Sequence, residues 1–541
     1  MRIPKLNEVK YYSTFRDMVD GLSLGNEDKA AISWFTRKGE EIGVDYGRFY
    51  SDVRSLANAL ASRGYSGRHV AVLGENSYEW LLVYFACAYC GAVTVCIDVE
   101  QPDETIVQML TMADTDVMFA ASPFVDICRK YSAGSKPVFT LNGAGSESLV
   151  TLIAEGETAA VELPVLSGDS IASIVFTSGT TSFSKPVLLS HEAILTNASD
   201  ALANVAIGKV AFTSLPFYHT YGLTCSVLSM LIGGAKLYIN GNLKTVMRDI
   251  HLAKPHTMLT VPLMLETIHR NLWQNAEETG KASGLRKLLK LRGFTKALGF
   301  KKCCKTLAAI REKCFGEIRL IICGGAHMDP DITEEFALLG VDVVQGYGIT
   351  ECAPLVSVNR NRANKPRSVG LVTPNCEVRL VDGEIFVRGK NLMSGYYNSP
   401  EMTAEVMEDG WFKTGDIGEI DRDGFLYITG RKKNLIVFKN GKKLSPEKLE
   451  EKIRSFSLVK DVVVYGAVNG MSTDDVQVAA SIYPDEEKAK GLDSYQILEE
   501  LQNKIVELNR ELPLYQQIQM VTIRENAFEK TSLQKVKRHL M

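Results

Sequence analysis

Helix-like and strand-like stretches alternate along this chain from about residue 45 onward, and this alternation constrains the fold more than any other feature. Residues 45–64 carry apolar side chains at helical spacing and end in Gly64, a residue type common just beyond a helix. A strand pattern follows at 69–74, then a helix that begins near Ser77, then a second strand pattern at 92–98. Because a strand–helix–strand order places both strands parallel in one sheet, the sequence predicts an α/β fold with largely parallel sheets.

Size and composition narrow the class of protein. The chain has 541 residues, which predicts three or four domain-sized units, and its 45% hydrophobic and 23% charged content is typical of a globular protein. A formal net charge of -3 gives no general attraction to nucleic acid, so no nucleic-acid partner is expected. The 11 cysteines are scattered, and the first residues lack the apolar core of a secretory signal. Both features indicate a reducing compartment, and we expect a cytoplasmic location.

One long apolar stretch tests that interpretation. Residues 80–97 contain no charged side chain, which is near the lower limit for a membrane-spanning helix. Gly91 divides the stretch, and its second half is rich in β-branched residues, so we predict a buried helix followed by a buried strand and no transmembrane segment. Cys87 and Cys90 have apolar neighbours and no second pair nearby, and they are interpreted as core thiols.

Two shifts in composition mark the organisation of the chain. Residues 285–305 contain eight Lys or Arg and no acidic residue. This segment is either a solvated helix face or an electropositive surface for a polyanionic partner such as a phosphorylated cofactor, an acidic carrier protein or a lipid surface. The second shift is near residue 430, where a basic loop precedes a helix predicted to begin at Ser445, with Pro446 at its first position. We place a domain boundary there, between 1–430 and 431–541.

The segment "FTSGTTSFSKP", residues 176–186, follows an apolar strand pattern. Gly179 permits unusual backbone dihedrals, so that N–H groups can converge on an anion, and Lys185 adds a mobile charge. The stretch is either a phosphate-binding loop or a solvated Ser/Thr turn between two strands.

Four further stretches carry groups that a nucleotide site needs. Two glycines in "CGGAHM" (323–328) allow the close approach of a flat ligand, and "QGYGITE" (345–351) offers an aromatic ring, a hydroxyl and the Glu351 carboxylate, a plausible Mg²⁺ ligand. The segment "KTGDIGEI" (413–420) is predicted to place Asp416 in a turn, where its carboxylate could accept both hydroxyls of a ribose. The chain ends in a basic tail, "FEKTSLQKVKRHLM".

In this order and at this spacing, the motifs resemble those of the adenylate-forming superfamily, which includes acyl-CoA synthetases, adenylation domains of peptide synthetases and firefly-type luciferases. The family phosphate loop reads T-S-G-T-T-G-x-P-K-G, and residues 177–186 match it except for Ser182, Ser184 and Pro186. The family tail reads K-T-x-x-G-K-I-x-R, and residues 530–538 place Gln534 in the glycine position and Lys535 in the lysine position. The segment "LPFYHTYGL" (215–223) resembles the family's acyl-pocket segment. The segments "VPLMLETIHRNLW", "IRLIICGGA" and "NGKKLSPEKLE" are most similar to the long-chain fatty acid–CoA ligases.

The resemblance implies a fold, a reaction and a set of roles. It implies a large N-terminal domain of packed α/β sheets and a small mobile C-terminal α+β domain. In the implied reaction, a fatty carboxylate of medium to long chain attacks the α-phosphate of ATP to give an acyl-adenylate and pyrophosphate, and the thiol of CoA then displaces AMP. Lys535, Thr350 and His219 are the implied catalytic residues, Glu351 and Thr180 the Mg²⁺ ligands, and Lys433 the hinge. The implied nucleotide- and CoA-binding residues are Thr177, Ser178, Gly179, Thr180, Thr181, Lys185, Gly324, Gly325, Ala326, Gln345, Gly346, Tyr347, Asp416, Arg431, Lys439 and Lys442.

Alternative functions stay open at this point. The acceptor could be an acyl carrier protein instead of CoA, or the chain could be a stand-alone adenylation enzyme, and the basic 285–305 segment is compatible with either acceptor. The chain could also be a catalytically impaired nucleotide- or acyl-binding protein, because Pro186 lacks the backbone donor that glycine supplies and Ser182 and Gln534 replace permissive glycines. A peripheral contact with a membrane is compatible with all of these functions.

Overall fold

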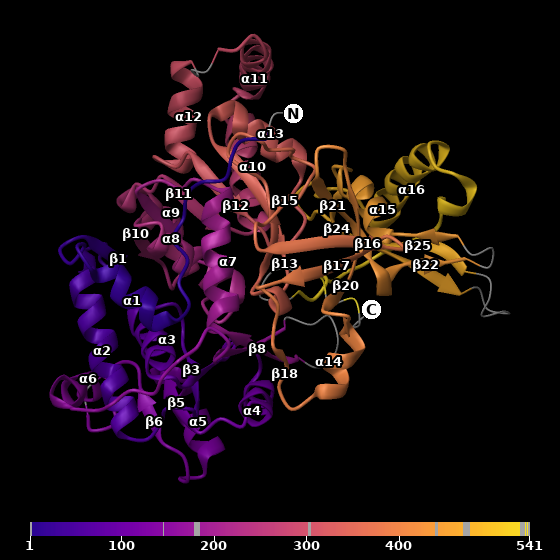
Figure 1. Ribbon diagram of the computed structural model, residues 1–541. Helices are drawn as coiled ribbons and strands as arrows, with labels where there is room; N and C mark the ends of the chain where they lie inside the picture. Colours follow the sequence, from indigo (N-terminus) through magenta and orange to yellow (C-terminus); the bar gives the residue numbers. More distant parts are fainter. Residues whose placement is uncertain are drawn as a thin grey trace.

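The computed structural model describes residues 3–143, 145–177, 184–300, 304–438, 442–468, 476–530, 536 and 538. Figure 1 shows two large sheets with helices around and between them, and a smaller unit formed by the C-terminal residues.

The first sheet has seven strands in the order β18-β8-β7-β4-β3-β5-β6. Its central strands are parallel, whereas β8 runs antiparallel to both β7 and β18. The strands are β3 (His69–Leu73), β4 (Val93–Cys96), β5 (Val117–Ala120), β6 (Val138–Thr140), β7 (Ile171–Phe176), β8 (Pro186–Ser190) and β18 (Gly395–Tyr396). The predicted strands at 69–74 and 92–98 are β3 and β4, and they are parallel as expected.

The second sheet is parallel along its first half, apart from the β1–β2 hairpin at its edge. That half consists of β1 (Ala30–Phe35), β2 (Glu41–Asp45), β9 (Val210–Thr213), β10 (Lys236–Ile239), β11 (Thr257–Thr260), β12 (Leu320–Cys323) and β13 (Asp342–Gly348). Beyond β13 the pairing becomes antiparallel, through β14 (Leu355–Val358), β15 (Gly370–Val372), β16 (Cys376–Val381), β17 (Glu384–Gly389), β19 (Met407–Glu408), β20 (Trp411–Ile420) and β21 (Phe425–Arg431).

The prediction of largely parallel sheets is therefore wrong for residues 355–431. The reason is local turn chemistry. Asp382 and Gly383 join β16 to β17, with φ of 51° and 82°, which is the two-residue hairpin turn that Asp-Gly favours. A chain that reverses in two residues can pair only antiparallel strands, since a parallel crossover needs about a dozen residues.

The helices cover and separate the two sheets (Figure 1). They are α1 (Phe15–Ser23), α2 (Tyr46–Ser62), α3 (Tyr78–Cys90), α4 (Asp103–Met112), α5 (Val125–Ser132), α6 (Leu149–Thr158), α7 (His191–Asn204), a π-helix (Tyr221–Leu228), α8 (Ser229–Ile232), α9 (Val246–Ala253), α10 (Pro262–Glu278), α11 (Ala282–Ala297), α12 (Lys305–Phe315), α13 (Pro330–Leu339) and α14 (Pro400–Val406). Helix α7 contacts both β8 of the first sheet and β14 of the second, so it lies between the two sheets.

Helix α3 shows why the apolar stretch at 80–97 folds inside the protein. The Ser77 hydroxyl accepts a hydrogen bond from the Trp80 N–H and begins the helix, and Gly91 ends it with a φ of 79°. Every side chain from Trp80 to Cys90 is buried, as expected for a helix that is apolar on all faces. Cys87 and Cys90 are core thiols as predicted, and burial raises the pKa of Cys90 to about 11. Among the described residues, no helix is both long enough and apolar enough to cross a bilayer.

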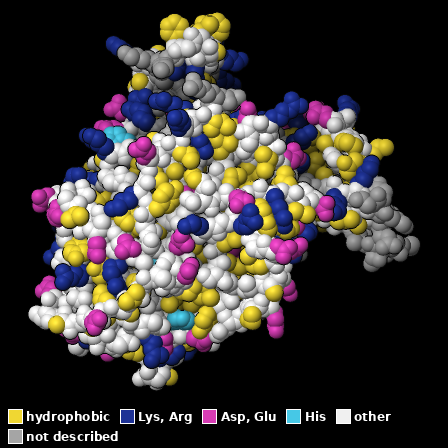
Figure 2. Space-filling model, viewed as in Figure 1, with side chains coloured by type: hydrophobic (Ala, Val, Ile, Leu, Met, Phe, Trp, Pro, Cys, Tyr) yellow, Lys and Arg dark blue, Asp and Glu magenta, His cyan; other side chains and the backbone are white. Residues whose placement is uncertain are grey.

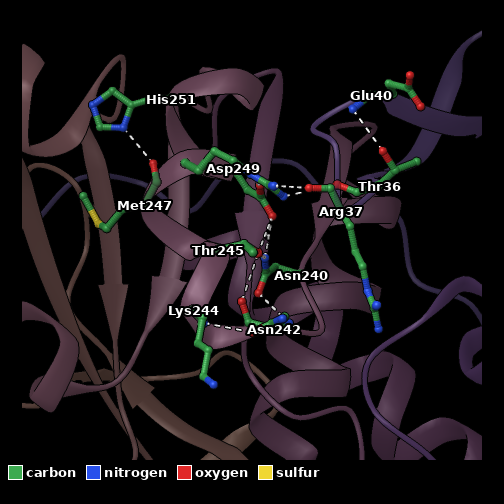
Figure 3. A network of polar contacts seen from close by, with 11 residues as sticks. Thr36, Arg37, Glu40, Asn240, Asn242, Lys244, Thr245, Met247, Asp249 and His251 are labelled. Atoms are coloured by element: carbon green, nitrogen blue, oxygen red, sulfur yellow. Dashed lines mark hydrogen bonds and ion pairs between the residues drawn. The ribbon is translucent and has the colours of Figure 1, made fainter.

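A buried carboxylate fixes one end of the second sheet (Figure 3). Asp249 in α9 is 4% exposed and accepts hydrogen bonds from Asn240 (2.7 Å), Thr245 (2.9 Å) and the Arg248 guanidinium (2.7 Å). Arg248 in turn donates to the Arg37 carbonyl (2.8 Å) in the turn between β1 and β2. A buried charge needs such partners, and this network is an anchor of the fold rather than part of a ligand site.

The described residues between 432 and 538 form the small α+β unit at the right of Figure 1. It contains β22 (Ile436–Val437), β23 (Lys443–Leu444), α15 (Pro446–Arg454), β24 (Val459–Val468), β25 (Val476–Pro484), α16 (Ser494–Arg510) and β26 (Ile518–Ile523). Ser445 and Pro446 begin α15 as predicted, but the Ser445 hydroxyl does not cap the helix; it donates to the Thr429 carbonyl (2.5 Å). The domain boundary at residue 430 stays a prediction.

Candidate active site

A cavity of about 1940 Å³ lies between the second sheet and the small unit. Its walls bring together segments that are far apart in the sequence. They contain every predicted site residue that the structure describes except Lys442: Thr177, Lys185, His219, Gly324, Gly325, Ala326, Gln345, Gly346, Tyr347, Thr350, Glu351, Asp416, Arg431 and Lys433. Six further predicted residues, Ser178, Gly179, Thr180, Thr181, Lys439 and Lys535, lie outside the described residues.

Asp416 holds a buried carboxylate between two donors in the cavity wall. The Tyr347 hydroxyl donates to Oδ2 (2.6 Å), and the Arg431 Nε lies 2.7 Å from Oδ1. Asp416 and Arg431 are register partners in β20 and β21, so the prediction that Asp416 lies in a turn is wrong. Gly415 has a φ of 69°, yet Asp416, directly after it, pairs across the sheet, so the strand continues through this point. The carboxylate is only 2% exposed, yet it lines the cavity.

A tyrosine links the carboxylate of Glu351 to the lysine of the predicted phosphate loop. The Tyr396 hydroxyl donates to Glu351 Oε1 (2.8 Å), and the Lys185 ammonium lies 4.8 Å from the centre of the Tyr396 ring. The pairing of β18 with β8 places Tyr396 opposite Val187, two residues after Lys185. Burial, and then the charge of Glu351, raise the pKa of Tyr396 well above its usual range, so the hydroxyl keeps its proton and acts as a donor.

The two ends of the predicted phosphate loop are joined to each other. The Thr177 N–H donates to the Lys185 carbonyl, and the Lys185 N–H donates to the Thr177 hydroxyl, each at 3.1 Å. Pro186 is the first residue of β8, a position where a strand tolerates proline. The backbone that enters the loop is thus hydrogen-bonded to the backbone that leaves it, at the cavity wall.

Another part of the wall combines glycines with a half-buried tyrosine. Tyr221 begins the π-helix and donates to the carbonyls of Thr260 (3.2 Å) and Ile322 (3.0 Å). A Cβ at Gly324 would lie 3.2 Å from the Tyr221 ring, so glycine at this position lets the strand end and the ring pack closely. π-helical turns occur frequently at functional sites. His219, 7% exposed, lies just before this helix and also lines the cavity.

The junction with the small unit is built from ion pairs. Lys432 Nζ lies 2.6 Å from Glu384, whose other oxygen accepts from the Gly415 N–H (3.1 Å). Lys433, the predicted hinge, follows directly; burial and the nearby Arg431 charge lower its pKa. The Lys442 ammonium lies 4.4 Å from the centre of the Tyr515 ring, within the small unit.

The tail reaches the cavity on either side of the predicted catalytic lysine. Lys530 and Val536 pair with each other and both line the cavity, and Lys530 lies 2.7 Å from Asp461. Arg538 also lines it and makes two hydrogen bonds, of 2.5 and 2.6 Å, to the Glu450 carboxylate. The role of Lys535 stays a prediction, because the residue lies outside the described part of the chain.

Sequence reasoning missed several of these groups. The groups that it missed are Tyr396, Glu384, Tyr221 and the Glu450–Arg538 pair. Most of their contacts join residues that are 45 or more positions apart in the sequence, for example 45 between Tyr396 and Glu351 and 88 between Arg538 and Glu450. No local spacing pattern signals such contacts, and each arises only from strand pairing or from the packing of the small unit.

Comparisons with known proteins agree with this arrangement. Residues 24–397 match the family model described as AMP-binding enzyme, and residues 433–541 match the model described as AMP-binding enzyme C-terminal domain. The first match covers well over half of the chain. This chain belongs to the AMP-binding enzyme family.

Individual relatives are more distant. A long-chain-fatty-acid–CoA ligase of Mycobacterium bovis is 28% identical over 451 residues, covering 77% of this chain and 74% of that ligase. An indoleacetate–CoA ligase of Aromatoleum aromaticum is 28% identical over 488 residues, covering 86% and 88%. The crystal structure of an anthranilate CoA ligase in complex with anthranoyl-AMP has the same fold, with a TM-score of 0.78, 18% identity and coverage of 98% and 96%.

These findings confirm the predicted superfamily and the predicted fold class, a large α/β part followed by a small α+β part. They also confirm the predicted enzyme class, an AMP-forming acid–thiol ligase. The named relatives act on different acids, so the acid that this chain uses is a separate question.

Proposed function

We propose that this enzyme activates a medium- to long-chain fatty acid with ATP and Mg²⁺ and transfers the acyl group to CoA. The relatives named above for fatty-acid and other CoA ligases support this proposal, and so does the apolar lining of part of the cavity. CoA is preferred over a carrier protein because those relatives are named for CoA. A cytoplasmic location belongs to the same proposal.

The observation that carries the proposal is the apolar part of the cavity wall. Beyond the nucleotide-facing groups, the same cavity is lined by apolar side chains from α7 and the residues just after it, the π-helix, α8 and β11, most of them buried: Ala201, Leu202, Val205, Ile207, Cys225, Met230 and Leu259. Ligand pockets commonly measure about 300–1,000 Å³, so this cavity has room for a nucleotide and a second ligand. An alkyl chain suits such walls because they leave no polar group for it to desolvate.

The other walls fit ATP. The Asp416 carboxylate, fixed by Tyr347 and Arg431, can accept the ribose hydroxyls, and the backbone of Gly324 and Gly325 lines the same cavity, where a flat base can approach it. Lys185 and Thr350 supply positive charge and a hydroxyl for the phosphates. Carboxylate and phosphate repel each other, so the first step depends on holding both in place and offsetting their charge. Lys535 is the group we assign to that bridge.

The residues present also fit Mg²⁺. Among the described residues, no cluster of three or more His, Cys, Asp or Glu could hold a metal by itself. This suits Mg²⁺, which is usually held by one or two carboxylates together with substrate phosphates and water. Glu351 is the carboxylate that we assign to it, oriented by Tyr396. When bound, the ion would offset phosphate charge.

In the second step, the CoA thiol must reach the acyl carbon after pyrophosphate has left. We assign Lys433 as the hinge about which the small unit turns between the two steps, and Lys439 and Lys442 as contacts for the CoA phosphates. The ion pair between Lys432 and Glu384 keeps the segment before the hinge attached to the large part.

A substrate series tests the proposal. The protein is supplied with ATP, Mg²⁺, CoA and straight-chain acids from butyrate to stearate, with AMP and the thioester both quantified. Burying one methylene contributes about 0.8 kcal/mol, so kcat/KM should rise about fourfold per added methylene until the apolar wall is filled. A flat profile, or a preference for an aromatic acid, would refute the fatty-acid assignment. AMP without acyl-CoA would refute CoA as the acceptor, and no turnover would indicate the impaired enzyme.

A pair of variants locates the acyl site. Ala201→Phe places a ring in the apolar wall and should remove activity with the longest acids while sparing the shorter ones. Ala206→Phe makes the same change at an exposed position a short distance beyond α7 and should leave the profile unchanged. Equal loss at every chain length in the first variant would place the acyl chain elsewhere.

A further inference from the structure

Helix α11 presents two faces of opposite character. Leu285, Leu289 and Arg292, spaced i, i+4 and i+7, are buried where the helix packs on α10 and α13. Leu291 and Phe294, on the other side, are 59% and 64% exposed. A helix that only covers a core carries polar groups on its outer side, so these exposed apolar residues need another explanation.

The exposed apolar residues share their face with lysines. Positions 287, 291, 294 and 298 follow helical spacing, and 290 lies beside them, so Lys287, Lys290, Leu291, Phe294 and Leu298 lie on one side of the helix. Both lysines are exposed, and Leu298 is 62% exposed. Together with Phe300, which is 64% exposed, these residues make up what we call the α11 face.

The end of this face is held in a defined conformation. The buried Arg292 donates from Nη1 to the Phe300 carbonyl (2.7 Å), and the Phe300 N–H donates to the Thr295 carbonyl (3.0 Å). Gly299, with a φ of 89°, allows the reversal that these bonds close. The fold therefore fixes the backbone of Phe300 in a position where its side chain is exposed to solvent, and the exposure is not due to fraying of a helix end.

The surroundings of the face are strongly basic. From residue 279 to 311 the chain has ten Lys or Arg and no Asp or Glu, although the whole protein has a net charge of -3. In Figure 1, α11 and α12 project from the body of the molecule, and Figure 2 shows apolar side chains at the tip of this projection with Lys and Arg around them.

We propose that the α11 face docks on an anionic lipid bilayer. Exposed Phe and Leu can enter the boundary between headgroups and acyl chains, while Lys287 and Lys290 meet the negative headgroups, which is how interfacial amphipathic helices bind. A second copy of this chain is a poorer occupant, because a two-fold contact would set the same positive surface against itself. An acidic protein would complement the positive charge, but it would also need a pocket for the apolar side chains at the projecting tip. A bilayer accepts these side chains without such a pocket.

The test is co-sedimentation of the full chain with phosphatidylcholine vesicles that contain or lack phosphatidylserine. The protein should sediment with the anionic vesicles only, and about 1 M salt should release it, because the Debye length falls to about 3 Å. Lys287→Gln with Lys290→Gln should weaken binding by about an order of magnitude or more. Leu291→Ser with Phe294→Ser and Phe300→Ser should weaken it as well.

Matched controls carry the same changes away from the α11 face. Lys488→Gln with Lys490→Gln, at exposed positions of the small unit, and Leu243→Ser, at a residue 74% exposed, should bind vesicles as the native chain does. All the variants should keep native turnover with a soluble acid, which shows that they fold.

Three outcomes would overturn the proposal. The first is that the native chain ignores anionic vesicles or binds neutral ones equally. The second is that the α11 variants bind as the controls do. The third is that, in the absence of vesicles, the lysine variant loses acyl transfer to an acidic acyl carrier protein or loses self-association in velocity sedimentation, which would assign the face to a protein partner.

Discussion

The Tyr347 hydroxyl donates a 2.6 Å hydrogen bond to Asp416 across 69 positions of the sequence. Burial, and then the charge of Asp416, raise the pKa of Tyr347 well above its usual range, so this hydroxyl stays a donor. With Arg431 on the other oxygen, the carboxylate is fixed before any ribose arrives. The nucleotide side of the cavity is therefore preorganised, which lowers the cost of binding.

We expect Tyr347→Phe to weaken AMP binding about tenfold, because a hydrogen bond to a charged group contributes roughly 1.5–3 kcal/mol and Asp416 would lose its orientation. Isothermal titration measures the effect. Tyr78→Phe is the matched control: it removes a buried hydroxyl that donates to Asp52 (2.9 Å) far from the cavity, and it should lower stability without changing AMP affinity. Equal AMP affinity in native protein and Tyr347→Phe would exclude a role for this pair in nucleotide binding.

Glu351→Gln should raise the Mg²⁺ concentration needed for half-maximal adenylation and lower its rate, because the neutral amide is a weak Mg²⁺ ligand. Tyr396→Phe keeps the carboxylate charge and removes only the hydrogen bond that orients it, so its effect should be smaller. Pyrophosphate release is measured across a Mg²⁺ titration for both variants. If Glu351→Gln gives the native titration curve, the ion is held elsewhere.

Gly430→Ala should disrupt the junction with the small unit. A Cβ there would lie 2.0 Å from the Ser445 hydroxyl oxygen and 2.9 Å from the Ser445 Cβ, and Ser445 donates to Thr429 at the same point. We expect a large loss of acyl-CoA formation and partial recovery when Ser445→Gly is added. A double variant no better than Gly430→Ala alone would show that the clash is not the cause.

Lys535→Ala should cripple acyl-adenylate formation and largely spare thioester formation from a pre-made acyl-adenylate, because only the first step brings two anions together. Lys537→Ala, also in the basic tail, serves as the control and should affect neither step strongly. The two half-reactions are assayed separately. Equal loss in both would mean that Lys535 does not bridge the two anions.

Buried His191 should make the fold sensitive to acid. Burial, followed by the Arg16 charge, lowers its pKa to about 4, while Asp17 acts weakly in the opposite direction, and its Nδ1 accepts from the Phe15 N–H (3.1 Å). The unfolded chain binds the proton more readily than the folded protein. The free energy of unfolding is therefore highest above about pH 6.5 and falls as the pH drops toward 4, with a loss of about 2 kcal/mol at pH 5. Urea unfolding of His191→Gln should show a shallower loss between pH 7 and 5. An unchanged slope would contradict this account.

The alternating pattern at 45–98 predicted β3, α3 and β4 well, because each element is long and its apolar spacing is clear. The antiparallel strands after β13 were missed, although Asp382-Gly383 is a strong hairpin signal. Motif spacing brought Tyr347, Glu351 and Asp416 into one hypothesis, and the structure places them in one cavity. Asp416 in a strand and Tyr396 beside Glu351 could not be predicted, since both depend on how distant strands pair.

The basic segment at 285–305 also shows what could not be predicted from the sequence alone. Its charge was visible in the sequence, but the burial of Arg292 and its bond to the Phe300 carbonyl were not. Only the packing of α11 on α13 separates a buried arginine from the exposed lysines, and it is this separation that distinguishes an apolar, basic face from a simple solvated helix.

The central claim is that a carboxylate oxygen attacks the α-phosphate of ATP, and an isotope experiment tests it most directly. The protein is given ATP, Mg²⁺, CoA and a fatty acid whose carboxylate oxygens are both ¹⁸O, and the products are analysed by mass spectrometry. The account predicts one ¹⁸O in each AMP and one in the acyl-CoA carbonyl, because the second step breaks the bond between the acyl carbon and the transferred oxygen. AMP without label, or ¹⁸O in phosphate together with ADP, would contradict an acyl-adenylate intermediate.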